Sequence, residues 1–174
     1  DEWDVLDDLG IPAEYCTGTE LPVPILGALR FPDQAQFHPL KFAAKIAAGL
    51  RIWENTKALE FSPTGVRTEA GWIRAEKIIV ATHFPVLNKH GRYFLKLYQH
   101  RSYVLALKDA PLIEGMYVDE AKNGLSFRRY GDLLLLGGGG HRTGMAPGGG
   151  QYHELEARAS QIWPGCRPAL RWSA

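Results

Sequence analysis

The run Gly137-Gly138-Gly139-Gly140-His141-Arg142 contains the residue types that could most directly do chemistry. Four glycines leave no side chain between the backbone and an approaching ligand. His141 adds a titratable ring, and Arg142 adds a permanent cation that can grip a carboxylate through two parallel hydrogen bonds. The pattern indicates either the wall of a substrate pocket or a flexible turn. Phosphate binding is a third interpretation, but the run lacks the Gly-Lys-Ser/Thr ending and the following helix of a P-loop.

Other reactive patterns are missing from the sequence. The six histidines (His38, His83, His90, His100, His141 and His153) form no i,i+3 or i,i+4 pair and have no cysteine partner, so no metal site is expected. A serine hydrolase is set aside because no Gly-x-Ser-x-Gly elbow occurs. Most of the aromatic residues in the second half are expected to pack in a core; they are Tyr98, Tyr103, Tyr117, Phe127 and Tyr130.

Composition narrows the class of protein. The 20 basic and 19 acidic residues nearly balance and are scattered, which argues against nucleic acid as a partner. The longest apolar runs, 133–136 and 78–81, are far too short to span a membrane. Cys16 and Cys166 lie far apart and do not suggest a disulfide framework, and no signal-type leader is present. We therefore expect a cytoplasmic protein.

The first half combines helices with short strands. Helical spacing of apolar residues predicts helices over 1–9 and from Pro39 to residue 50, and the prolines between 19 and 32 permit only an edge strand over 25–29. Residues 51–54 read as a short strand, and 58–61, 65–68 and 72–75 as a three-strand meander. Residues 77–81, with three consecutive β-branched side chains, predict a strand buried on both faces that ends at Ala81-Thr82-His83.

The second half predicts antiparallel strands covered by a helix. The expected strands are 97–107, 116–118 and a hairpin of 125–129 with 133–136, followed by a helix over 152–163. The fold class is therefore α+β, with a partial α/β piece before the antiparallel sheet. We divide the chain at residues 1–36, 37–85 and 86–174. The chain starts without Met and ends in a strand-like run, so we expect an excised segment of a longer protein.

Several segments in order resemble one family. They are Phe37-His38-Pro39-Leu40-Lys41-Phe42-Ala43, Ile52-Trp53-Glu54-Asn55-Thr56-Lys57-Ala58, Gly65-Val66-Arg67-Thr68 and Ile73-Arg74-Ala75-Glu76-Lys77-Ile78-Ile79-Val80-Ala81-Thr82. This order is similar to that of FAD-dependent oxidoreductases of the D-amino-acid oxidase/glycine oxidase type. The resemblance implies that 37–85 belong to the FAD-binding domain and 86–174 to a substrate-binding domain truncated at its C-terminus, with residues 1–36 packing against the latter.

The resemblance also implies a cofactor and site residues. FAD would lie near Ala58, Ala81, Thr82 and His83, and near Gly139 and Gly140. The substrate, an amine or amino acid oxidised by hydride transfer to FAD, would contact His141 and Arg142, with Arg128 and Tyr117 as further candidates. The chain departs from the family pattern in two ways: His83 stands where glycine is usual, and no Gly-x-Gly-x-x-Gly turn is present to hold the pyrophosphate. We therefore expect the isolated chain to bind FAD weakly or not at all.

Two alternatives stay open at the level of sequence. A non-catalytic assembly module could present the aromatic sheet to a protein partner, and a dehydrogenase could pass electrons to a partner instead of oxygen. Unpaired edges of the strands expected at 51–54 and 77–81 would favour self-association of the isolated chain.

Overall fold

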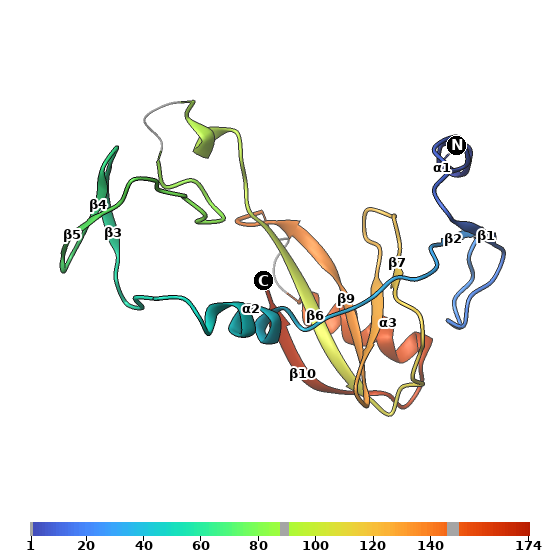
Figure 1. Ribbon diagram of the computed structural model, residues 1–174. Helices are drawn as coiled ribbons and strands as arrows, with labels where there is room; N and C mark the ends of the chain where they lie inside the picture. The colour runs from blue at the N-terminus through green and yellow to red at the C-terminus, as the bar shows by residue number, and fades with distance from the viewer. Residues whose placement is uncertain (1, 88–90, 146–149) are drawn as a thin grey trace. The chain divides into compact units, whose positions relative to one another are not determined.

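The computed structural model describes residues 2–87, 91–145 and 150–174. The chain divides into two compact units, which are described separately below (Figure 1). Unit 1 consists of Asp1–Phe31 together with Lys89–Ala174, and unit 2 is Pro32–Asn88. Among the residues that the structure describes, no helix is long and apolar enough to cross a membrane.

Unit 1 is built on a five-stranded antiparallel sheet with the strand order β10-β6-β9-β8-β7. The strands are β6 (His100–Lys108), β7 (Tyr117–Val118), β8 (Ser126–Tyr130), β9 (Leu133–Arg142) and β10 (Arg167–Ser173). Each strand expected in this half is present, but the strand predicted at 97–107 begins at His100 and the strand predicted at 133–136 continues to Arg142. The tetraglycine run lies inside β9, whereas the sequence predicted that the strand would end before it.

One face of this sheet is covered by α3 (Gln151–Ile162) (Figure 1). Leucines from β6 and β9 point toward the helix and are fully buried, as are Leu155 and Ala159 on the helix itself. The helix predicted over 152–163 is therefore confirmed, with its apolar side inward as the spacing indicated. The buried cluster comprises Leu21, Leu105, Leu107, Ile113, Leu125, Phe127, Leu134, Leu136, Leu155, Ala159 and Trp163.

The N-terminal segment belongs to unit 1. It contains α1 (Glu2–Asp8) and a small hairpin of β1 (Glu14–Cys16) with β2 (Ala28–Arg30), which is fastened by an ion pair of 3.1 Å between Arg30 and Glu14. Leu21, which follows this hairpin's first strand, reaches the core of the sheet. The predictions of a helix at the start and of a short edge strand before Pro32 are confirmed.

A β-bulge interrupts the pairing of β6 with β9. Arg101 pairs with His141 and Tyr103 pairs with Gly138, so that one residue of β6 lies opposite Gly139 and Gly140. Gly139 has φ of 64°, a left-handed conformation that glycine adopts without a steric penalty. Pairing of β9 with β8 stops at Gly137, and β9 therefore continues for five residues beyond the end of β8.

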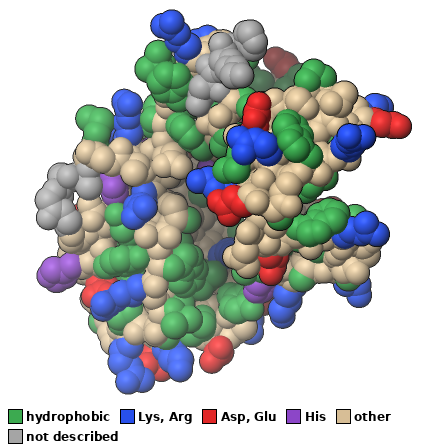
Figure 2. All heavy atoms as spheres, turned by 90° about the vertical axis from the view of Figure 1, so that its left-hand side faces the viewer, with side chains coloured by type: hydrophobic (Ala, Val, Ile, Leu, Met, Phe, Trp, Pro, Cys, Tyr) green, Lys and Arg blue, Asp and Glu red, His purple; other side chains and the backbone are tan. Residues whose placement is uncertain are grey.

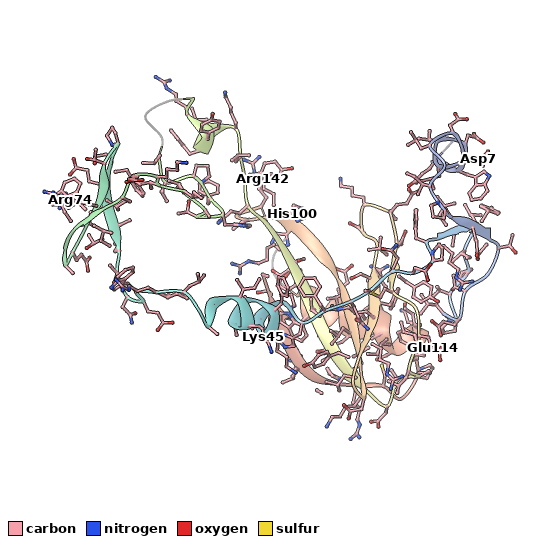
Figure 3. The ribbon with its side chains drawn as sticks, viewed as in Figure 1. Asp7, Lys45, Arg74, His100, Glu114 and Arg142 are labelled. Atoms are coloured by element: carbon pink, nitrogen blue, oxygen red, sulfur yellow. The ribbon has the colours of Figure 1, made fainter. Side chains whose placement is uncertain are left out.

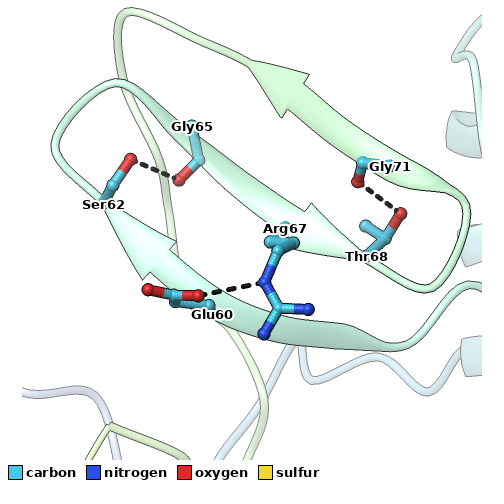
Figure 4. A network of polar contacts seen from close by, with 6 residues as sticks. All are labelled: Glu60, Ser62, Gly65, Arg67, Thr68 and Gly71. Atoms are coloured by element: carbon cyan, nitrogen blue, oxygen red, sulfur yellow. Dashed lines mark hydrogen bonds and ion pairs between the residues drawn. The ribbon is translucent and has the colours of Figure 1, made fainter.

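Unit 2 contains α2 (Pro39–Ala47) and a three-stranded meander of β3 (Ala58–Ser62), β4 (Gly65–Thr68) and β5 (Gly71–Arg74). The His38 ring caps the helix by accepting a hydrogen bond of 3.3 Å from the Lys41 N–H. Polar contacts fasten the meander: Arg67 Nε donates to Glu60 at 3.0 Å, and the Ser62 and Thr68 hydroxyls donate to the Gly65 and Gly71 carbonyls (Figure 4). The helix and the meander were both predicted correctly.

Two strand predictions in unit 2 are wrong. Residues 51–54 and 77–81 have no strand conformation, and the side chain of Ile79 is 90% exposed. A run of β-branched residues favours an extended backbone, but a strand forms only when its N–H and C=O groups find a partner strand. In the described part of the chain the meander strands pair only with one another, and neither run joins their sheet. The structure therefore has no strand edge at 51–54 or 77–81 that could favour self-association.

The fold class is α+β, as predicted. Helices occur together with antiparallel strands, which form three sheets among the described residues. Large hydrophobic side chains nevertheless reach the surface at many places, scattered among charged residues (Figure 2).

Shortening the centre of the sheet core should destabilise unit 1. We expect Leu136→Ala to lower the free energy of unfolding by about 2–5 kcal/mol, because the side chain is fully buried and the cavity cannot close completely. Urea denaturation would measure the change. The control is Leu26→Ala, whose side chain is fully exposed and whose removal should change the stability by less than about 0.5 kcal/mol.

Candidate functional site

The sheet of unit 1 has one face that α3 leaves bare. Successive residues of a strand point to opposite faces, so the neighbours of the buried leucines point away from the helix. On β10, Arg171 forms an ion pair of 2.5 Å with Glu156 of α3, and the next residue, Trp172, therefore points to the bare face. One concavity lies on this face, and a second adjoins it where β9 continues past the end of β8.

The first concavity, which we call the apolar groove, has a volume of about 300 Å³. Its lining includes Val104, Met116, Val118, Arg128, Leu135 and Trp172. Most of these side chains are hydrocarbon or aromatic, and the Arg128 guanidinium is the single cation among them. Such a combination suits a ligand with an apolar body and one anionic group, because apolar contact supplies affinity and the cation fixes orientation.

The second concavity, which we call the basic hollow, has a volume of about 510 Å³. Its charged and titratable lining residues are His100, Asp119, Lys122, His141 and Arg142, and its backbone wall is provided by the glycines of β9. Val118, Ser126 and Gly137 line both concavities, so the basic hollow and the apolar groove adjoin each other. His100 and Arg142 come from β6 and β9 and lie near each other at one end of these strands (Figure 3).

His141 and Arg142 point to opposite faces of the sheet, as neighbours on a strand must. The His141 ring stacks on Tyr103 with 5.6 Å between the ring centroids, and Tyr103 in turn contacts Tyr152 of α3. The Arg142 guanidinium lies 4.6 Å from the centre of the Tyr98 ring. Both residues border the basic hollow. The structure thus assigns His141 packing contacts on the helix side, whereas Arg142 is exposed on the bare face.

Tyr117 and Arg128, the other two residues predicted to bind substrate, both border the apolar groove. The four predicted residues therefore lie around two adjoining concavities. The Tyr117 hydroxyl is already engaged, because it donates a hydrogen bond of 2.8 Å to Glu20 in the N-terminal segment. Arg128 is exposed, and among the described residues no ion pair of its side chain is found.

Glu20 ties the N-terminal segment to the loop before β7. Its carboxylate accepts hydrogen bonds from the backbone N–H groups of Glu114 and Gly115, at 3.0 and 2.8 Å, besides the bond from Tyr117. Desolvation alone would raise the pKa of Glu20, but these three donors outweigh it and lower the pKa below its usual value. The pKa of Tyr117 is raised to about 12 by desolvation, by the hydrogen bond to Glu20 and by the negative charge of the Glu20 carboxylate.

The residues predicted to bind the cofactor fall in both units. Ala58 begins β3, where it pairs with Thr68, and it is exposed. Ala81, Thr82 and His83 lie in a stretch without strand conformation, in which the Thr82 hydroxyl donates to the Phe84 carbonyl at 2.8 Å. His83 has φ of 61°, a conformation that favours glycine. Glycine is usual at this position in the family that the sequence segments resemble.

The glycines of β9 have packing reasons within unit 1. A Cβ atom on Gly137 would lie 2.4 Å from the Ser126 hydroxyl, and one on Gly138 would lie 2.8 Å from Leu125 and 2.9 Å from Leu155. A Cβ atom on Gly140 would lie 3.0 Å from the His100 ring. Neighbouring side chains of unit 1 therefore occupy much of the space that these glycines leave beside the strand. A role of Gly139 and Gly140 beside a cofactor stays a prediction.

Sequence reasoning missed several residues of the bare face. His100 and Val104 are four positions apart in the strand predicted at 97–107, and the alternation of a strand was the available signal for grouping them. Trp172 and Lys122 gave no such signal, because their positions depend on the pairing of β10 with β6 and on the loop between β7 and β8. Among the described residues, no group of three His, Cys, Asp or Glu side chains could hold a metal ion. His90 lies outside the described residues.

Comparison with known proteins identifies the family. The family model described as FAD dependent oxidoreductase matches residues 1–174. The chain belongs to this family. FAD is the cofactor of this family. The resemblance to FAD-dependent oxidoreductases that the sequence segments carried is confirmed at this level.

One curated relative is similar to the chain over most of its length. It is the Bacillus subtilis (strain 168) protein named "Putative Rieske 2Fe-2S iron-sulfur protein YhfW", with 32% identity over 169 residues and 88% of this chain covered. The chain spans about a third (33%) of the length of that relative. No solved structure matches the chain.

The Glu20 contact predicts opposite responses to acid and alkali. Because the folded-state pKa of Glu20 is lowered, its stabilisation is present above the pKa that the carboxyl has in the unfolded chain and is lost as the pH falls through the folded value. Because the pKa of Tyr117 is raised, its stabilisation is present below pH 10.0 and is lost as the pH rises to about 12. Tyrosinate absorbance should show one tyrosine titrating near pH 12, which Tyr117→Phe removes and Glu20→Gln shifts to lower pH.

The matched control for this titration is Glu14→Gln, which removes an exposed carboxylate of the same N-terminal segment. It should leave the midpoint of Tyr117 unchanged. A Tyr117 midpoint that is equally high in Glu20→Gln would show that the contact with Glu20 does not hold the proton on the phenol.

Proposed function

We propose that the full protein oxidises an amine or an amino acid by hydride transfer to FAD, and that the bare sheet face of unit 1 supplies the substrate-contacting surface. The observation that carries the proposal is the family match over the whole chain together with a concave apolar face that carries an exposed arginine. When bound, FAD supplies the redox chemistry: the C–H bond next to the amine breaks, its electron pair passes to the flavin with the hydrogen, and the amine becomes an iminium that water hydrolyses.

The residues of the apolar groove fit the space beside a planar ring. Val104, Leu135 and Trp172 offer a hydrocarbon and aromatic wall, and a wall of that kind excludes water from a reacting C–H bond. A hydride needs a dry path, because water would solvate the charges on donor and acceptor. In this proposal the chain contributes shape and dryness to the site, while proton transfer is left to solvent or to substrate.

Arg128 would orient an acidic substrate. Its guanidinium can hold a carboxylate by two parallel hydrogen bonds and so fix which hydrogen of the substrate faces the flavin. Tyr117, with its hydroxyl engaged by Glu20, would support the groove from below rather than donate to substrate. The D-amino-acid oxidase/glycine oxidase type of substrate remains part of the proposal and is supported by the order of the segments in the sequence.

The simplest test is the colour of the full protein. We expect purified full-length protein to be yellow, and its flavin absorbance to bleach when an amine or amino-acid substrate is added without oxygen. The 174-residue chain alone should bind added FAD far more weakly, because it has no Gly-x-Gly-x-x-Gly turn for the pyrophosphate. Micromolar affinity of the chain for FAD would contradict the second expectation, and a colourless full-length protein would contradict the proposal.

A matched pair of variants tests the substrate-contacting face. Arg128 points to the bare face and Arg129, the next residue of β8, points to the opposite one. Arg128→Gln should raise the KM for an amino acid about tenfold or more, because a charge-assisted pair is lost, while Arg129→Gln should leave the KM nearly unchanged. Equal KM values in the two variants would remove Arg128 from this role.

A second candidate concerns the electron acceptor. The name of the Bacillus subtilis relative includes a Rieske 2Fe-2S centre. The described residues of this chain offer no metal-holding group, so such a centre would be held by another part of the protein. This favours a dehydrogenase that passes electrons to an iron–sulfur centre. The oxidase is favoured instead if the full protein under air forms one peroxide for each substrate consumed; a dehydrogenase should form little or none.

We also propose a reducing compartment such as the cytoplasm. The support is that Cys16 and Cys166 are both free thiols in the structure. Alkylation of freshly prepared protein under denaturing conditions should label both thiols.

A further inference from the structure

The basic hollow has features of a binding site that the proposed oxidation does not use. Its volume of about 510 Å³ falls within the range of small-molecule sites, and it opens where β9 continues beyond the end of β8. It shares Val118, Ser126 and Gly137 with the apolar groove. A ligand long enough to leave the groove would therefore enter this hollow next.

The charges in the hollow are unbalanced toward positive. Arg142 and Lys122 are exposed cations, and no ion pair of either is found among the described residues. Asp119 is the opposing carboxylate, and its Oδ1 already accepts a hydrogen bond of 3.0 Å from the Ala121 N–H. The rings of His100 and His141 complete the titratable groups. Two unpaired cations facing one engaged carboxylate favour an anionic ligand.

Arg142 is held in a way that leaves its donors available. Its guanidinium lies 4.6 Å from the centre of the Tyr98 ring, a contact that fixes the side chain without using a hydrogen-bond acceptor. The guanidinium therefore keeps its N–H groups for a ligand, and their planar arrangement matches a carboxylate. His100, opposite Arg142 in the β6–β9 pairing, adds a neutral or charged donor beside it.

The backbone wall allows an anion to come close. Gly137, Gly138 and Gly140 line the hollow and place no side chain between the strand and the cations. A Cβ atom on Gly137 would lie 2.4 Å from the Ser126 hydroxyl, and one on Gly140 would lie 3.0 Å from the His100 ring. The glycines of β9 thus add no side chain to the hollow.

We propose that the basic hollow binds an anionic group at the far end of the substrate, and that the substrate is an amine or amino acid with an apolar middle and a second carboxylate or similar anion. The inference rests on the proposed function for the placement of the reacting amine in the apolar groove. It adds a second recognition point, with Arg142 and Lys122 as the residues that determine specificity. Neutral amines of the same length would bind less tightly, because they leave these cations unpaired.

Calorimetric titration of the full protein tests this without any turnover. The probes are linear dicarboxylates from glutarate to suberate, each compared with its monoamide, which has the same shape and one charge less. At least one dicarboxylate should bind about tenfold more tightly than its monoamide. Arg142→Gln should reduce this preference to less than about twofold, and Lys122→Gln should weaken it.

The matched control is Arg101→Gln. Arg101 is exposed on β6 and pairs with His141, on the opposite face of the sheet from Arg142. This variant should keep the full preference for the dicarboxylate. Circular dichroism melting of all three variants establishes that each one folds, which the exposed positions of the three side chains lead us to expect.

The outcomes separate this inference from the proposed function. Equal affinity for dicarboxylate and monoamide, no detectable binding of either, or a preference that survives both Arg142→Gln and Lys122→Gln would overturn the inference. Flavin absorbance of the same sample reports on the proposed function independently. A yellow protein that binds dicarboxylate and monoamide equally refutes only the anionic subsite. A colourless protein that binds dicarboxylates more tightly refutes only the flavin chemistry.

Discussion

The antiparallel pairing of β6 with β9 is the interaction on which the rest of unit 1 depends. Leu105 lies opposite Leu136 and Leu107 opposite Leu134, and all four side chains are buried against α3. Burial of these leucines fixes the register, because a slip by one residue would turn the entire apolar set toward solvent. Once the register is fixed, Val104 and Gly137 must lie on the other face, and the bulge at Gly139 and Gly140 then turns Arg142 to that face as well.

The two faces of the sheet consequently serve different purposes. The face toward α3 is a closed hydrocarbon core, beside which the Tyr103 ring stacks on His141 and meets Tyr152 edge to face. The bare face collects the residues that alternate with the core, among them Arg128 and Trp172, and is concave. The sequence offered an aromatic interaction sheet as an alternative function. Phe127 is buried and Tyr103 and Tyr117 pack against the core, so most of these aromatic residues stabilise the fold.

Local patterns predicted much of this fold from sequence. The helix periodicity of residues 152–163 and the alternation of residues 97–107 each arise from a single buried face, and both elements are present. The prediction of a strand at 77–81 was wrong, because three β-branched residues favour an extended backbone but do not indicate which strand would pair with it. The site was predictable only in part, because local patterns do not reveal how far a strand extends. His141 and Arg142 are adjacent in the sequence, but because the glycine run lies inside β9, their side chains point to opposite faces of the sheet.

The discontinuity of unit 1 has a consequence for how the protein is made. Its first 31 residues emerge from the ribosome before all of unit 2, yet Glu20 and Leu21 make their contacts with residues about 90 positions later. Residues 1–31 therefore lack these contacts while Pro32–Asn88 is synthesised, and unit 2 can already begin to fold during that time. Chaperone engagement and proteolytic loss during translation should concentrate on this segment, and a rearranged gene that joins it directly to residue 89 would shorten that delay.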